Sequence, residues 1–187
     1  MALLFSARLT DSAELRPWDL TMAPRMVEAL VENQAHIRRW LNWPRDGYGL
    51  DDARRFIELK LEIWARDGLM SVGIWRGERL IGGVTPNCGS LRHRSVALGY
   101  WVAASEQGQG LATRACHAVI DDLFTARGMH RVVINVHPDN VRSRRVPERL
   151  GFRQEGVLRG VVRHDHGFDD WVVYAMLEDE WGRSRRE

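Results

Sequence analysis

A glycine-rich turn between a strand and a helix is the segment of this sequence best suited to bind a ligand. Residues Glu106–Thr113 follow the β-forming run Ser95–Val102 and open an amphipathic run that reaches Arg127. Glycines let a backbone approach a ligand closely and adopt positive φ. The first N–H groups of a helix have no intrahelical partner and carry partial positive charge, so they bind phosphates. The pattern predicts a pyrophosphate site on the amides of Gln109–Thr113, with a ligand-free glycine cap as the alternative.

Dinucleotide-binding sites use the same physics and need separate consideration. Their fingerprint has three spaced glycines early in a βαβ unit and an acidic residue about 20 positions further on. Here the turn lies in the middle of the chain, the third glycine is absent and the preceding strands read as an antiparallel meander. The sequence therefore disfavours a dinucleotide.

The elements that must position this turn can be read from hydrophobic periodicity and punctuation. Helices are expected over residues 21–40 (broken near Asn33), 51–67 (with Asp51 as N-cap and Gly68 at its end), 110–127 and 141–150. One or two opening strands are expected within 8–16, then strands at 69–75, 79–85, 95–102, 131–136, 157–163 and 171–177. This order predicts a mixed sheet in an α/β or α+β domain.

Two motifs in the same order resemble one enzyme family. Gln107-x-x-Gly110-x-Ala112 resembles the acyl-CoA motif Arg/Gln-x-x-Gly-x-Gly/Ala of the GNAT N-acetyltransferases. Asn140-x-x-Ser143 and the residues after it resemble the next conserved block of the RimJ/RimL branch, the ribosomal-protein N-terminal acetyltransferases and their relatives. Further points of likeness are Tyr100-Trp101, Ala112-Thr113, Leu150-Gly151-Phe152, Glu155-Gly156, Gly167, Asp170, Tyr174 and Glu180-Trp181. The likeness runs from Leu15 to Trp181.

The resemblance implies a GNAT-like fold, a central, mostly antiparallel sheet flanked by helices, in a single domain over residues 1–187 with a polar tail after about 181. It implies transfer of an acetyl group from acetyl-CoA to a primary amine, first of all the α-amine of a protein or peptide N-terminus. The alternatives are acetylation of a small-molecule amine, such as an antibiotic or metabolite, and a non-catalytic acyl-CoA-binding module. A homodimer is possible, and the sequence does not determine the oligomeric state.

The resemblance also assigns roles to individual residues. Asn140 would contact the pantetheine or an ordered water, and Ser143 would protonate the departing CoA sulfur, although Asn and Ser three apart at a helix start are first of all capping residues. The acceptor pocket would be walled by Trp40, Trp43 and Tyr48, for which core packing is an equal alternative. The expected cofactor-binding residues are Val102, Gln107, Gly108, Gln109, Gly110, Leu111, Ala112, Thr113, Asn140, Ser143 and Arg145.

The sequence departs from the family pattern at two positions. Many members carry a Glu general base where this chain has Ala97, and a base must lie within hydrogen-bond reach, directly or through one water. His137, just after the expected buried strand, ranks first as a substitute, with a structural histidine as the alternative. Pro147 falls beyond the first helical turn and predicts a kink or irregular start. The other candidate bases are His164, Asp165, His166 and Asp170.

Composition narrows the protein class. A formal charge of +2 does not indicate a nucleic-acid partner. Two cysteines, Cys88 and the core-like Cys116, make no disulfide framework, which favours a reducing, cytoplasmic location. The apolar patch Ala2–Phe5 is too short for a signal peptide, and no stretch approaches the length of a membrane span. His164-x-His166 has no third ligand at suitable spacing, so we expect no metal.

Overall fold

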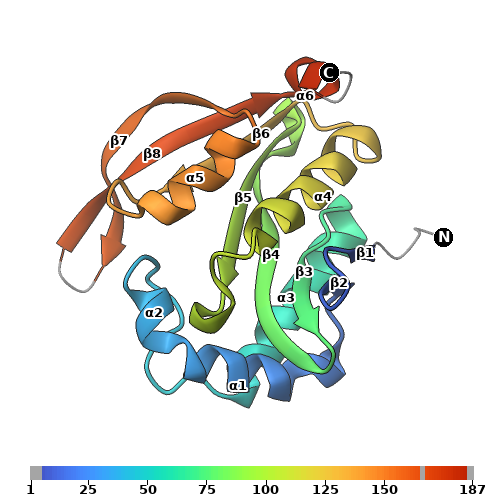
Figure 1. Cartoon of the computed structure of the whole chain (residues 1–187), viewed down its shortest axis with the longest axis vertical. Helices are drawn as coiled ribbons and strands as arrows, with labels where there is room; N and C mark the ends of the chain where they lie inside the picture. Colours follow the sequence, from blue (N-terminus) through green and yellow to red (C-terminus); the bar gives the residue numbers. More distant parts are fainter. Residues whose placement is uncertain (1–5, 165–166, 185–187) are drawn as a thin grey trace. The chain divides into compact units, whose positions relative to one another are not determined.

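The computed structural model of the chain describes residues 6–164 and 167–184 (Figure 1). Its described residues form two compact units. The first comprises the chain up to Thr85 together with Tyr100–Ala115, and the second comprises Pro86–Gly99 and the chain from Cys116 onward. The expectation of a single domain over 1–187 stays a prediction. The patch Ala2–Phe5 lies outside the described residues.

The first unit begins with an antiparallel meander and three helices (Figure 1). Its strands are β1 (Ala7–Arg8), β2 (Glu14–Pro17), β3 (Val72–Arg76) and the first part of β4 (Arg79–Ser90). Its helices are the 3₁₀ turns η1 (Leu20–Met22) and η3 (Ala104–Glu106), then α1 (Ala23–Glu32), α2 (Gln34–Arg38) and α3 (Leu50–Asp67). The expected hairpin is present, since Arg76 pairs with Arg79 across its turn.

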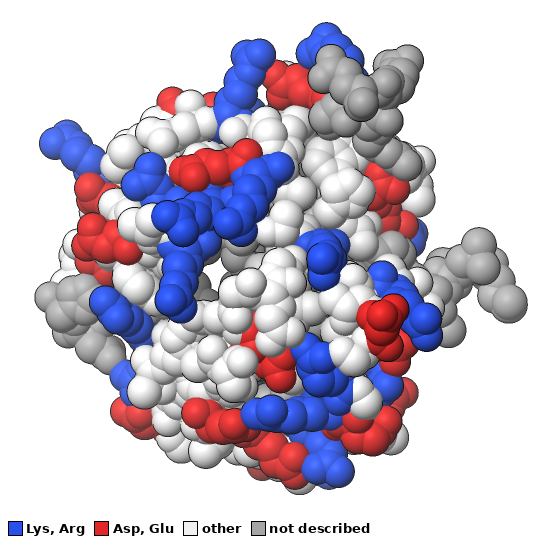
Figure 2. Space-filling model, viewed as in Figure 1, with Lys and Arg blue, Asp and Glu red and all other residues white. Residues whose placement is uncertain are grey.

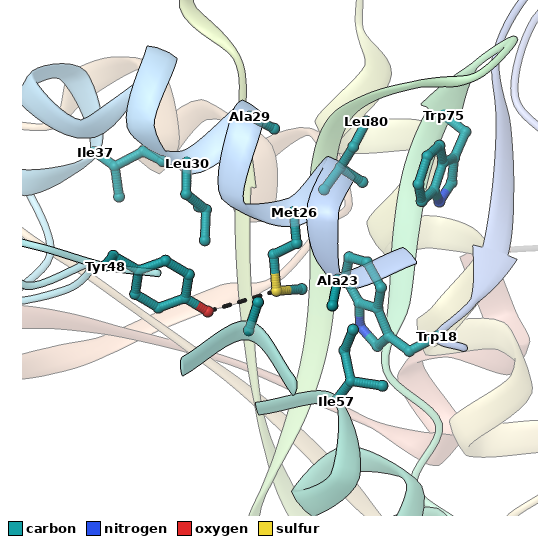
Figure 3. Close-up of a cluster of buried hydrophobic side chains, with 11 residues drawn as sticks. Trp18, Ala23, Met26, Ala29, Leu30, Ile37, Tyr48, Ile57, Trp75 and Leu80 are labelled. Carbon is teal, nitrogen blue, oxygen red and sulfur yellow. Dashed lines mark hydrogen bonds between the residues drawn. The ribbon is translucent and has the colours of Figure 1, made fainter. Parts of the chain in front are cut away.

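A cluster of buried side chains forms the core of this unit (Figure 3). Met26 and Leu30 of α1 and Ile57 of α3 lie together with Trp75 of β3. The Trp75 ring lies over Gly73 of the same strand. A Cβ added at Gly73 would lie 2.5 Å from the Trp75 indole nitrogen. A side chain at that position would therefore displace the ring.

The break between α1 and α2 lies at Asn33, as expected. The buried Asn33 amide donates to the carbonyl of Ala29 at 2.9 Å, and its Oδ1 accepts the N–H of Ala104 at 2.9 Å. A side chain that satisfies one backbone group of its own helix and one of η3 fixes the point where the helix changes direction. The early helices are therefore attached to the segment that leads into the glycine turn.

The start of α3 differs from the expectation that Asp51 is the N-cap. The N-cap is Gly49, and its N–H donates to the carboxylate of Asp52 at 3.0 Å. The residue whose carboxylate reaches back is at the third helical position, as in a capping box. The C-terminal expectation is confirmed, because Gly68 ends the helix with φ of 72°.

The second unit consists of the end of β4, the start of β5 (Ser95–Val102), and β6 (Arg131–Val136), β7 (Arg153–His164) and β8 (Gly167–Leu177). Its helical segments are η2 (Leu91–His93), most of α4 (Leu111–Thr125), α5 (Val141–Arg149) and α6 (Glu178–Ser184). Helix α6 occupies part of the segment expected to be a polar tail.

The sheet is mixed and mostly antiparallel, which confirms the expected fold class. Its strand order is β1-β2-β3-β4-β5-β6-β8-β7. β5 pairs with β6 in parallel, whereas the β6–β8 and β7–β8 pairs are antiparallel. β7 and β8 are longer than the expected closing pair, and the register of their pairing shifts between Gln154 and Gly156 and between Leu158 and Val162.

Helix α4 buries the apolar face expected from its periodicity. Leu111, Ala115, Val119 and Leu123 are all buried. Cys116 is fully buried as well, and burial raises the pKa of its thiol. Among the helices within residues 6–164 and 167–184, none has the length and apolarity to cross a membrane.

Candidate active site

The glycine turn has the backbone conformation that its composition predicts. Gly108 and Gly110 have φ of 82° and 73°, in the left-handed region that favours glycine. A Cβ added at either position would meet no atom within 4 Å. The first hydrogen bond of the helix runs from the Arg114 N–H to the Gly110 carbonyl at 3.1 Å. The backbone N–H groups of the residues before Arg114 therefore have no intrahelical acceptor. The turn therefore offers backbone donors with open space above two glycines.

A charged network lies beneath this turn, and the sequence analysis did not find it. Arg76 donates through one nitrogen to Glu106 Oε2 at 2.9 Å and to Gln109 Oε1 at 2.9 Å. The Gln109 amide donates to the same Glu106 oxygen at 3.2 Å. An acidic residue directly before the glycine turn was the available signal, because a carboxylate with little exposure requires a nearby cation.

The other cofactor candidates of the first unit have different surroundings. The Gln107 side chain lies 2.8 Å from His36 Nε2 of α2, with donor and acceptor set by the histidine tautomer. Leu111 is core. The Thr113 hydroxyl oxygen is buried with no hydrogen-bond partner among the described residues. Thr113 is thus a polar group of the first helical turn that a ligand or water would satisfy.

Asn140 and Ser143 lie in the second unit, where they start α5. Asn140 is the N-cap, and its Oδ1 accepts the Ser143 N–H at 3.1 Å. Its carbonyl accepts the Arg144 N–H at 3.0 Å. The capping interpretation is confirmed for Asn140. The cap uses the backbone of Ser143, so the role expected for its hydroxyl does not conflict with capping.

Helix α5 (Val141–Arg149) includes Pro147, beyond its first turn. The expectation of a kink or an irregular start stays a prediction. Val146 and Pro147 are both buried, and Pro147 has no N–H to donate to the Ser143 carbonyl.

The arginines of α5 divide into an anchoring group and an exposed group. Arg144 donates to the Tyr174 hydroxyl at 2.9 Å and to the Pro138 carbonyl at 3.3 Å, which joins α5 to β8. This bond to the hydroxyl raises the Arg144 pKa. The exposed group is Arg142, Arg145 and Arg149. Basic side chains gather on the face of the molecule drawn in Figure 2. Arg145 therefore lies where it can meet an anion from solvent.

His137 has both ring nitrogens engaged. Nδ1 accepts the N–H of Asp139 at 3.1 Å, so the neutral ring carries its proton on Nε2, which lies 3.6 Å from Asp169 Oδ2. His164 Nε2 lies 3.5 Å from the same oxygen. In this arrangement the lone pair of His137 already has a donor, so taking a proton from an amine requires that the ring first release Asp139.

The remaining base candidates are likewise engaged or undescribed. Asp170 accepts the N–H of Gly160 at 2.8 Å. Asp165 and His166 lie outside the described residues. Asp169, which brings the two histidines together, was not singled out from the sequence, because nothing local to the hairpin indicates that it faces His137.

Ala97 is the last residue of β5 paired with β6. The parallel pairing joins Ser95–Ala97 to Arg131–Val133, while both strands continue further. In the continuing part of β6, Asn135 Oδ1 is buried with no hydrogen-bond partner among the described residues.

The three aromatic candidates for the acceptor pocket belong to the first unit and differ in exposure. Tyr48 is buried in the core, its hydroxyl 3.5 Å from the Met26 sulfur, and burial raises its pKa to about 12. Trp43 is stacked on Phe56 with centroids 5.9 Å apart. Trp40 is partly exposed, with the Arg39 guanidinium 4.8 Å from its ring centre. Tyr48 and Trp43 thus contribute packing, and Trp40 and Trp43 are both partly exposed.

The described part of the chain holds no candidate metal site. No group of three or more His, Cys, Asp or Glu residues there is arranged to hold a metal ion.

Comparison with known proteins supplies the family. Residues 13–153 match the model of the acetyltransferase (GNAT) domain. YdaF of Bacillus subtilis (strain 168) is 29% identical over 185 residues, covering 95% of this chain and 98% of that protein. The ribosomal-protein-serine acetyltransferase of Escherichia coli (strain K12) is 26% identical over 172 residues, covering 92% and 96%.

A solved structure extends the likeness to a CoA-bound relative. Mycobacterium smegmatis RimJ in complex with CoA-disulfide is 29% identical with a TM-score of 0.78, and the match covers 90% of this chain and 83% of that chain. The open glycine turn, with its backbone donors at a helix start, fits the phosphates of such a ligand. The chain therefore belongs to the GNAT acetyltransferases, in the RimJ/RimL-like branch, and transfers an acetyl group from acetyl-CoA to a primary amine.

Proposed function

We propose that the acceptor is the α-amine at the N-terminus of a protein, a ribosomal protein in the first instance. The observation that carries this proposal is that neither Ala97 nor His137, among the described residues, offers a poised base: Ala97 has no titratable group, and the His137 lone pair already accepts the N–H of Asp139. The similarity to an Escherichia coli enzyme named for acetylating ribosomal-protein serine supports the same acceptor class.

Amine pKa values explain why a missing base favours α-amines. An amine must be neutral to attack the thioester. For a Lys side chain of pKa ~10.4, deprotonation at pH 7.5 costs about 4 kcal/mol, whereas for an α-amine of pKa ~7.8 it costs about 0.5 kcal/mol. An enzyme without a strong base therefore works best on acceptors that are already largely neutral.

We place acetyl-CoA with its pyrophosphate on the amides of Gln109–Thr113. The positive-φ glycines and the open space above them support this placement. Val102 and Gln107 precede the turn, and the exposed Arg145 would meet a phosphate of the cofactor. Asn140 would contact the pantetheine.

The reaction then needs one proton donor. The amine nitrogen attacks the thioester carbonyl, the new C–N bond forms, the C–S bond breaks and the amine loses its proton to water. Ser143 would protonate the departing thiolate, and its backbone is held for this by the Asn140 cap. His137 would act as a proton relay only after its ring releases Asp139.

The acceptor would lie against Trp40, with Trp43 and Tyr48 as the packed layer behind it. The partial exposure of Trp40 and the core position of Tyr48 support this order. We also propose a cytoplasmic location, because the relatives are named for modifying ribosomal proteins, and we keep the homodimer as an expectation that sedimentation can check.

The test compares two peptides of one sequence. One has a free N-terminus and no Lys, and its counterpart has a blocked N-terminus and one Lys. We expect kcat/KM at pH 7.5 to be at least about 10²-fold higher for the free α-amine, a conservative fraction of the difference in deprotonation cost. A panel of small-molecule amines serves as the control for acceptor class. Faster turnover of the Lys peptide, or of a small amine, would overturn the proposal.

A further inference from the structure

A buried carboxylate lies directly behind the turn that would bind the pyrophosphate. The Glu106 side chain is 10% exposed, and it accepts a hydrogen bond from Gln109, a residue of the turn itself. A negative charge in this position opposes the binding of phosphates, because a carboxylate with little water around it is poorly screened. The turn therefore needs a cation close to Glu106.

Arg76 provides that cation and contacts the turn at the same time. One of its nitrogens donates both to Glu106 Oε2 and to Gln109 Oε1, each at 2.9 Å. Its other terminal nitrogen donates to the Ser12 hydroxyl, which fixes the guanidinium from the opposite side. Arg79 is a weaker second neighbour, 3.9 Å from Glu106 and paired more closely with Glu32.

The hydrogen bonds form a closed triangle around a residue between two glycines. Gln109 lies between Gly108 and Gly110, both at positive φ, where the backbone has few constraints of its own. The Arg76 and Glu106 contacts hold the Gln109 side chain, and they use the oxygen and nitrogen of that side chain and not the backbone N–H of Gln109. The side chain of Gln109 thus supports the turn, and its backbone N–H is the group offered to a ligand.

We propose that Arg76 is a positioning residue for acetyl-CoA: it neutralises Glu106 and fixes Gln109, so that the turn presents its amides in a positive field. The inference rests on the proposed placement of the pyrophosphate on Gln109–Thr113. Arg76 touches neither the thioester nor the amine in this scheme, so its effect falls on cofactor affinity and not on the acetyl-transfer step.

The test uses calorimetry with acetyl-CoA and steady-state kinetics on the full chain. For Arg76→Gln we expect the Kd of acetyl-CoA to rise about tenfold or more, as for one uncompensated charge near phosphate. We expect kcat at saturating acetyl-CoA and the acceptor KM to stay within about twofold. In the double variant Arg76→Gln/Glu106→Gln most of the affinity should return, because the neutral amide needs no cation.

Glu106→Gln alone separates this electrostatic role from a merely structural one. With Arg76 left in place, the proposal expects acetyl-CoA affinity to be unchanged or tighter, whereas a scaffold role of the ion pair expects it to weaken. Arg25→Gln, which removes the exposed ion pair with Glu28 on α1, is the matched control and should leave the Kd unchanged.

Three outcomes would overturn the inference: no change in Kd for Arg76→Gln, no recovery in the double variant, or weaker binding by Glu106→Gln. The placement of the pyrophosphate is tested separately by Gly110→Val. If that folded variant binds acetyl-CoA normally, the placement fails and the role of Arg76 fails with it. If it does not bind but the arginine variants behave like wild type, only the inference about Arg76 is wrong.

Discussion

At the scale of single residues, the start of α5 shows how helix capping and catalysis can share one segment. The side-chain oxygen Oδ1 of Asn140 accepts the backbone N–H of Ser143, so the hydroxyl of Ser143 is not needed for the cap. The two side chains should therefore give different mutant phenotypes. Such a difference would distinguish a catalytic role from a helix-capping role in a segment whose sequence pattern fits both.

For Ser143→Ala we expect kcat to fall roughly 10²-fold, the usual contribution of a positioned proton donor. Acetyl-CoA affinity and the free energy of unfolding should change little. Asn140→Ala is the comparison, because it removes the cap and should cost about 1 kcal/mol of stability in urea titrations. A Ser143→Ala enzyme with normal kcat and reduced stability would reverse the assignment.

At the scale of elements, the glycine turn combines backbone strain with ligand access, and a second turn allows the two to be separated. Gly77, between β3 and β4, has φ of 57° and open space around its missing Cβ, as Gly110 does. The two glycines therefore have similar backbone requirements, but only Gly110 lies at the start of a helix with unpaired N–H groups.

We expect Gly110→Val and Gly77→Val to lose similar stability, about 1–2 kcal/mol or more for a left-handed residue with a Cβ. Only Gly110→Val should lose acetyl-CoA binding in calorimetry, because its side chain would occupy the space above the amides. Equal affinities in the two folded variants would mean that the phosphates bind elsewhere.

The start of α3 makes a pH-dependent contribution to stability. The Gly49 N–H, together with the Arg45 guanidinium, holds the pKa of Asp52 below its usual value. A carboxyl whose pKa is lower in the folded state stabilises the fold above its unfolded pKa, and this stabilisation is lost as pH falls through the folded pKa.

Asp52→Asn should therefore lower the urea midpoint at pH 7, and the difference from wild type should shrink steadily between about pH 5 and pH 2. Asp51→Asn is the control, because the neighbouring Asp51 is exposed and does not cap the helix. A wild-type advantage that persists unchanged at the lowest pH would show that the charge of Asp52 is irrelevant.

At the scale of the whole molecule, the two compact units share strands. β4 and β5 each contribute residues to both units. If one unit unfolded alone, both strands would have to be interrupted at an internal residue. Six of the eight tryptophans belong to the first unit, which makes tryptophan fluorescence a probe of that part. These six are Trp18, Trp40, Trp43, Trp64, Trp75 and Trp101.

We expect urea unfolding followed by tryptophan fluorescence and by far-ultraviolet circular dichroism to give one coincident transition, as for a single domain. Acetyl-CoA at 100 times its Kd should raise the free energy of unfolding by about 2.7 kcal/mol in both signals. Two separated transitions, or stabilisation seen by one probe alone, would contradict the single-domain prediction.

The sequence by itself determined the elements whose signals are local. The turn around Gly108 and Gly110, the end of α3 at Gly68 and strands β5 and β6 all follow from residue types within a few positions of one another. These features depend on backbone conformation and short-range periodicity, which a linear pattern carries directly. The family motif belongs to the same class, because its glycines and the helix start are contiguous.

Tertiary structure alone decided which distant side chains meet. Arg76 reaches Glu106 of η3 from the β3–β4 hairpin, and Asp169 brings His137 and His164 to one oxygen. The core position of Tyr48, which the sequence left even between packing and acceptor binding, has the same origin. Ion pairs and core contacts depend on where the chain returns in space. The sequence pattern around each partner is that of an ordinary polar or aromatic residue, so it could not reveal these contacts.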